Sequence, residues 1–162
     1  MSAYLKYEAI KKGESKAKGH EGDKGWIELG SVSLGVGRSI SSPVGASSKR
    51  EASAPNVSEI VLSKLMDSTS PLIFQEALLG KAASAQVDLV ETHEEMLETF
   101  LEIKLTNAMI ASYSTSSNGG RPSEKFSLNF TKIEYKYTPF DDKHQRGSPV
   151  LFMYDVTTAT AT

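Results

Sequence analysis

The sequence contains no cysteine among its 162 residues, which excludes disulfide bonds and thiolate chemistry. Histidine is scarce too, because His20, His93 and His144 are the full set and lie far apart along the chain. No two of them have the spacing of a zinc-binding motif. We therefore expect no metal site and three exposed loop histidines. Enzymatic use of these residues would require one of them to meet carboxylates in a cleft.

Long apolar runs and an excess of charge of one sign are also missing. The apolar stretches are far shorter than the roughly 20 residues of a membrane-spanning helix. Lys and Arg number 18 against 20 Asp and Glu, so the basic footprint of a nucleic-acid binder is absent. The first residues have neither the basic nor the apolar region of a signal peptide. We predict no nucleic-acid partner, no membrane insertion, and any export by a route independent of a cleaved leader.

Motifs for nucleophilic catalysis and phosphate binding are missing as well. No serine lies in a G-x-S-x-G elbow, and the glycine-rich stretch 30–37 has the spacing of neither a dinucleotide-binding loop nor a P-loop. The pair Asp141-Asp142 lies between Pro139 and Gly147, which is typical of a solvated turn. We therefore expect no catalytic residue and no cofactor, and a binding or structural role.

Alternation of apolar and polar residues with period two predicts β-strands over 4–10, 26–36, 57–66, 126–137 and 150–156. The apolar set changes faces at Gly30, which indicates a bulge or sharp bend there. It changes faces again midway through 126–137, which we interpret as one long strand. Strands that switch their buried face often turn the corner of a barrel.

One short helix is predicted between Ser70 and Gly80. Ser70 is a suitable N-cap, Pro71 a suitable first helical residue, and Gly80 a suitable left-handed C-cap. The apolar stripe consists of Ile73, Phe74, Ala77 and Leu78. About ten residues are too few for a stable isolated helix, so packing must hold it.

Two segments are less regular. Residues 85–112 fit both a strand pattern and a helical stripe, and the strand reading places a hairpin at His93-Glu94-Glu95. Residues 37–56 read as a long loop without secondary structure, and such loops are often functional. The prediction is one domain over 1–162: a mostly β, small antiparallel barrel of two sheets with one short α-helix.

Several blocks together resemble the haemolysin-coregulated protein (Hcp) family of type VI secretion systems. They are Gly13-Glu14-Ser15 with His20, Trp26-Ile27-Glu28, residues 67–72, residues 110–116, residues 119–124 and residues 126–137. The likeness covers about residues 4–156. Two departures are Lys16-Ala17-Lys18-Gly19 after the first block and the tryptophan-poor run that follows Trp26.

The resemblance implies an Hcp-like barrel that forms hexameric rings, which stack into a hollow tube expelled from the bacterial cytoplasm. Its implied partners are further copies of itself, a VgrG spike, a contractile sheath and small effector proteins in the lumen. It also favours strands over 85–112 and likens the 37–56 loop to the family's extended docking loop. We expect no C-terminal effector extension.

A wide pore needs a wall of polar, small residues. The candidate lumen-facing residues are Ser31, Ser33, Lys125, Ser127 and Asn129. The candidate inter-subunit or stacking residues in the loop are Arg38, Ser39, Ile40, Val44, Lys49, Arg50 and Glu51. The alternative is a secreted, adhesin-like β-module that binds a ligand or receptor as a monomer or dimer.

Overall fold

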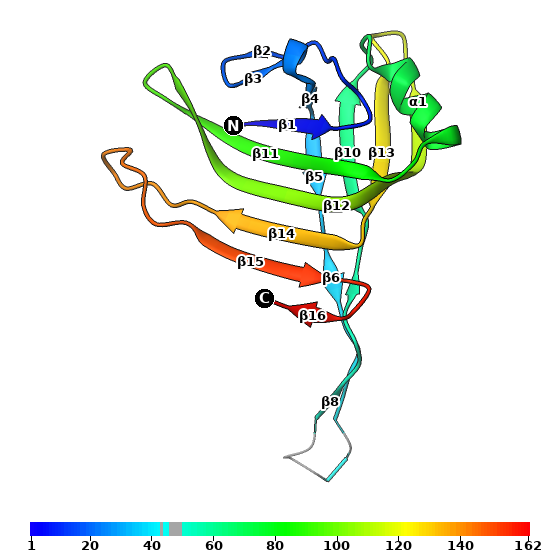
Figure 1. Ribbon diagram of the computed structural model, residues 1–162, viewed down its shortest axis with the longest axis vertical. Helices are drawn as coiled ribbons and strands as arrows, with labels where there is room; N and C mark the ends of the chain where they lie inside the picture. Colours follow the sequence, from blue (N-terminus) through cyan, green and yellow to red (C-terminus); the bar gives the residue numbers. More distant parts are fainter. Residues whose placement is uncertain (43, 46–49) are drawn as a thin grey trace.

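The computed structural model describes residues 1–42, 44–45 and 50–162, and its strands form two sheets around one core (Figure 1). The large sheet has the strand order β16-β15-β14-β12-β11-β1-β4. Its strands are β1 (Ser2–Tyr7), β4 (Trp26–Leu29), β11 (Ala83–His93), β12 (Met96–Ser116), β14 (Lys132–Tyr137), β15 (Val150–Asp155) and β16 (Thr160–Ala161). The small sheet contains β5 (Ser31–Ser33), β10 (Ile60–Leu65), β13 (Ser123–Asn129) and the second half of β12. The mostly β prediction is confirmed.

The chain passes from one sheet to the other at three corners. The predicted bend at Gly30 separates β4 from β5, and the Gly30 amide donates to the Ser63 carbonyl at 2.7 Å. Strand β12 turns at Asn107, whose φ of 52° lies in the left-handed region that asparagine tolerates. The predicted long strand over 126–137 is instead two strands, because the chain leaves β13 and crosses at Phe130-Thr131 to begin β14. The sheets are thus joined by continuous chain.

The ambiguous segment is a β-hairpin, as the family resemblance favours. Strands β11 and β12 pair antiparallel from Ala83↔Ala108 to His93↔Met96. Glu94 and Glu95 make the turn with φ of 46° and 75°, the left-handed values of a two-residue hairpin turn. The pairing explains why the segment forms strands and not a helix, because the backbone N–H and C=O groups of both strands are hydrogen-bonded along their length.

The core lies between the facing sheets. Its fully buried members include Leu5, Tyr7, Ile27, Ile60, Leu62, Val87, Ile103, Leu105, Phe126 and Leu128. They come from alternate positions of their strands, so the period-two pattern correctly predicts which face is buried. The Tyr7 hydroxyl donates to the Ala108 carbonyl at 3.1 Å, which satisfies a polar group inside the core.

Helix α1 (Ser70–Leu79) forms where predicted, but two expected details are wrong. Thr69, not Ser70, precedes the helix, and the Ser70 hydroxyl instead donates to Glu124 Oε2 at 2.8 Å. Gly80 is extended with φ of −67°, not left-handed. A Cβ on Gly80 would lie 2.3 Å from the Glu76 carbonyl oxygen, so close approach requires glycine there. No helix in the described part of the chain is long and apolar enough to span a membrane.

The predicted apolar stripe of α1 is only partly correct. Ile73 is fully buried against the barrel and Ala77 packs beside it. Phe74 and Leu78 face outward and are more than half exposed, together with Leu79. The Phe74 ring centroid lies 5.5 Å from that of Tyr113 on β12, so the ring also packs against the barrel surface. The helix therefore has apolar side chains on both its inner and outer sides.

A buried ionic network ties α1 to the barrel. The Lys64 ammonium donates to Glu124 Oε2 and to Asp67 Oδ1, each at 2.8 Å. Tyr113 donates to the second oxygen of the Glu124 carboxylate. Burial and this acidic neighbour raise the pKa of Tyr113 to about 12. Burial alone would raise the pKa of Asp67, but hydrogen bonds from Lys64 and Thr69 outweigh it and hold that pKa below its usual range.

The loop that precedes β4 lies so close to it that only glycine fits at position 13. A Cβ on Gly13 would lie 2.0 Å from the Trp26 carbonyl oxygen. We expect Gly13→Ala to lower the free energy of unfolding by about 1–3 kcal/mol, because backbone must move to admit the methyl group. Gly120→Ala is the matched control, since nothing lies within 4 Å of its Cβ position. Urea unfolding of both variants would test this, and equal midpoints would contradict it.

Candidate functional site

The outward face of the small sheet is lined mainly by serines, and we call it the serine face. Its serines are Ser31, Ser33, Ser63, Ser112, Ser114, Ser116, Ser123 and Ser127. Opposite them in the pleat, Ile60, Leu62, Phe126 and Leu128 point into the core. Among the outward positions of these strands, all within the described residues, Lys125 is the one charge.

Four of the five predicted lumen residues lie on this face with exposed side chains: Ser31, Ser33, Lys125 and Asn129. Ser127 also points to this side but is only 3% exposed, because it donates to Glu59 Oε2 at 2.7 Å and bonds Ser112 Oγ at 2.7 Å. Its side chain is therefore covered in this chain. Ser31 and Ser63 form a similar hydroxyl pair at 2.6 Å.

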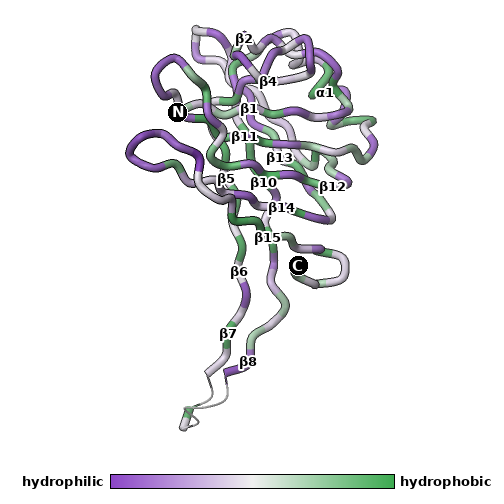
Figure 2. Tube along the Cα trace, turned by 60° about the vertical axis from the view of Figure 1, so that its left-hand side comes forward, coloured by the Kyte–Doolittle hydropathy of each residue, from purple (hydrophilic) through white to green (hydrophobic). Residues whose placement is uncertain are grey.

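The segment predicted as a structureless loop contains two short ladders and projects from the barrel as an arm (Figure 2). Strands β6 (Val36–Gly37) and β9 (Asn56–Val57) pair at its base, and β7 (Ile40–Ser41) and β8 (Glu51–Ala52) pair further out. The Ser53 amide donates to the Ser39 carbonyl at 2.9 Å between the ladders. The expectation of a loop without secondary structure was wrong, because strands this short leave almost no periodic pattern.

The predicted contact residues of the arm are exposed where the structure describes them. Arg38, Ser39, Ile40, Val44, Arg50 and Glu51 all present their side chains to solvent. The remaining residue of that set, Lys49, lies outside the described residues. The Arg50 guanidinium donates from Nε to Ser42 Oγ at 3.2 Å, which links the two sides of the arm.

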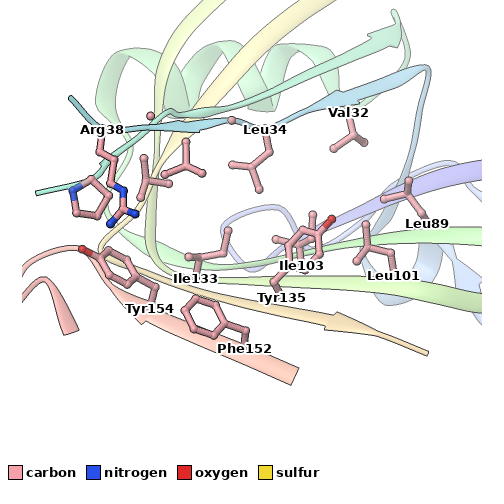
Figure 3. Close-up of a pocket in the computed structure, with 15 residues that line it drawn as sticks. Val32, Leu34, Arg38, Leu89, Leu101, Ile103, Ile133, Tyr135, Phe152 and Tyr154 are labelled. Carbon is pink, nitrogen blue, oxygen red and sulfur yellow. The ribbon is translucent and has the colours of Figure 1, made fainter. Parts of the chain in front are cut away.

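An apolar groove of about 750 Å³ lies between the base of the arm and the inner side of the large sheet (Figure 3). One wall carries Val32, Leu34 and Val36, and the other carries Leu101, Ile103, Ile133, Tyr135, Phe152 and Tyr154. Arg38 lies at one end, on the side of Tyr154. Strands β14 and β15 extend the large sheet past the small one, so the base of the arm faces their inner side chains across the groove. Sequence reasoning missed this groove.

Two of the three histidines differ from the expected exposed loop positions. His20 is buried: its Nε2 pairs with Asp88 Oδ2 at 2.8 Å, and its ring stacks on Tyr4 at 4.7 Å. His93 ends β11 and stacks on His144 at 4.1 Å between ring centroids. Only His144 is exposed as predicted. Across the described residues, no group of three His, Cys, Asp or Glu side chains is arranged to hold a metal ion.

A two-sheet β-barrel with one short helix and a projecting β-arm is thus the class of protein that the chain represents. Residues 4–137 match the model of the family described as "Type VI secretion system effector, Hcp". The chain belongs to this family. No curated protein matches it.

Solved structures share the fold along nearly the whole chain. A structure described as a type six secretion system protein has a TM-score of 0.88 at 21% identity, with 99% of each chain covered. Hcp1 from Salmonella typhimurium has a TM-score of 0.77 at 19% identity, covering 99% of this chain and 98% of that one. A type VI secretion system effector from Yersinia pestis has a TM-score of 0.66 at 24% identity, covering 95% and 99%. At these identities the likeness concerns the fold.

Proposed function

We propose that this protein is the non-enzymatic building block of the type VI secretion tube. Copies assemble into hexameric rings, the rings stack into a hollow tube, and small effector proteins are carried in its lumen. A VgrG spike caps the tube and a contractile sheath expels it from the cytoplasm, so export needs no cleaved leader. The family match and the shared fold support this proposal, and the serine face carries it.

The serine face has the properties that a lumen wall needs. Hydroxyl groups remain hydrated and carry no net charge, so a protein can pass along such a wall without strong attraction to it. The face is also one side of an antiparallel sheet whose other side is buried, which is the usual arrangement of a sheet with one solvated face. Ser31, Ser33, Lys125 and Asn129 would line the lumen, while Ser127 would stay beneath Glu59.

The arm is suited to contacts between copies. It extends well beyond the barrel, and its exposed residues include the apolar Ile40 and the basic Arg38 and Arg50. A contact between two different surfaces of identical chains is heterologous, and such contacts close into rings or extend into filaments. A tube of stacked rings uses both outcomes.

Electron microscopy of the purified protein tests the proposal directly. We expect negative-stain images to show rings with a hollow centre, and analytical ultracentrifugation to show a species about six times the chain mass at high concentration. A strict monomer under every condition would contradict the proposal. A monomer or dimer with a saturable ligand would instead support the adhesin-like alternative.

A further inference from the structure

The loop between β12 and β13, residues 117–122, lies at one end of the serine face, on the side of α1 (Figure 1). The ladder of the two strands ends at the pair Ser116↔Ser123, and the loop spans the residues between them. It contains Asn118-Gly119, the one Asn-Gly pair in the whole sequence. Glycine has no side chain to shield its backbone nitrogen, so the Gly119 nitrogen is accessible to the side-chain amide of the residue before it.

The backbone of the loop leaves both of these groups free. Asn118 is exposed, and Gly119 has a φ of 98°, in the left-handed region that favours glycine. Apart from chain neighbours, nothing lies within 4 Å of the Cβ position of Gly119 or of Gly120. Ser117 Oγ donates to the Gly120 carbonyl at 3.3 Å, but no described residue forms a hydrogen bond with the Asn118 side chain or the Gly119 N–H. The side chain can therefore turn onto the neighbouring nitrogen without breaking a contact.

The other three asparagines lie within strands and precede residues that have side chains. Asn56 and Asn129 lie in β9 and β13, where the backbone is extended and paired. Asn107 donates from Nδ2 to Thr131 Oγ1 at 3.2 Å. The residues that follow these three are valine, phenylalanine and alanine, whose Cβ atoms hinder approach to the backbone nitrogen. Asn118 is thus distinguished by its loop and by its neighbour together.

We propose that Asn118 is a site of spontaneous deamidation, with water as the co-reactant. The Gly119 backbone nitrogen gives up its proton to solvent and attacks Asn118 Cγ, and a C–N bond forms. The side-chain nitrogen takes a proton from water and leaves as ammonia, so the product is a cyclic imide, a succinimide. Water then opens this ring at either carbonyl, which gives aspartate or isoaspartate at position 118. A carboxylate replaces a neutral amide, so the formal net charge of the chain changes from −2 to −3.

The modification should leave the barrel folded and change the charge at one rim of the serine face. The far end of the loop is held to the barrel, because Arg121 Nε donates to the Met66 carbonyl at 2.6 Å and the Met66 amide donates to the Pro122 carbonyl at 2.9 Å. Asn118 lies on the unattached part. In the proposed tube, on which this consequence alone rests, each modified copy adds a carboxylate at one mouth of the ring lumen.

Mass spectrometry of the purified protein tests the site. Incubation at mildly alkaline pH should add one mass unit at Asn118, and fragmentation of the tryptic peptide 105–125 separates this change from one at Asn107. We expect Asn118 to convert more than about tenfold faster than any other asparagine. Gly119→Ala should slow the conversion by a similar factor. Gly120→Ala is the matched control and should leave the rate unchanged, since the space around both Cβ positions is open.

The unfolding midpoint and electron microscopy of the same samples complete the test. Conversion of the folded chain with a normal midpoint is the expected result. Equal conversion of all the asparagines, or an unchanged rate in Gly119→Ala, would overturn the site. Conversion only after unfolding in urea would overturn it as well, because the folded loop would then protect Asn118. Absence of rings from a sample in which Asn118 converts would count against the proposed tube alone.

Discussion

Replacing Lys64 by methionine should lower the free energy of unfolding by about 3–5 kcal/mol, the usual cost of breaking a buried ion pair from one side. The Lys64 and Glu124 side chains are 1% and 0% exposed, so neither charge is hydrated. Without the ammonium group, Glu124 and Asp67 lose their shared cation. Urea or thermal unfolding followed by circular dichroism measures the loss.

The second half of this test is a double-mutant cycle. Adding Glu124→Gln to Lys64→Met removes the stranded carboxylate, so the double variant should be more stable than Lys64→Met alone. Additive effects of the two substitutions would show that the pair does not interact.

Sequence reasoning could have found this pair. Lys64 follows Ile60 and Leu62 on the same side of β10, and Glu124 precedes Phe126 and Leu128 on the same side of β13. A charged residue at the next inward-facing position indicates one of two things: either the strand ends there, or the charge is buried and paired with an opposite charge. The register Lys64↔Glu124 makes the two direct neighbours, and register is set by the whole fold.

The strands were predictable because each carries its burial pattern locally, and the face changes marked the corners at Gly30 and near Phe130. The helix termini were less so, since the Ser70 hydroxyl has a partner 54 residues away in Glu124. A capping pattern in sequence cannot reveal such competition from a distant acceptor. The helical pattern also assigned Phe74 and Leu78 to the core, although both are more than half exposed in the single chain.

The candidate lumen residues came from alternation alone, and alternation sets only the side to which a residue points. It placed Ser31, Ser33, Lys125 and Asn129 on the outward side but could not show that Glu59 covers Ser127. The groove was beyond sequence reasoning, because its lining comes from β5, the arm, β11, β12, β14 and β15. Those segments are brought together only by the crossing of the two sheets.

Removing the arm should leave a folded barrel that no longer stacks. Replacing residues 39–54 by Asn-Gly closes the β6–β9 ladder with a short turn and removes Ile40, Arg50 and Glu51. These side chains are exposed and lie outside the core, so the unfolding midpoint should change by no more than a few degrees. Ring stacking should be strongly weakened, because the proposed contact between copies is lost.

Tube length in negative-stain images is the deciding measurement, and the unfolding midpoint of the same variant is its control. Ser114→Ala, an exposed change on the serine face, should leave both tube length and stability unchanged. Short or absent tubes together with a normal midpoint would place the arm at the stacking contact. Tubes of normal length would show that the arm is dispensable for stacking.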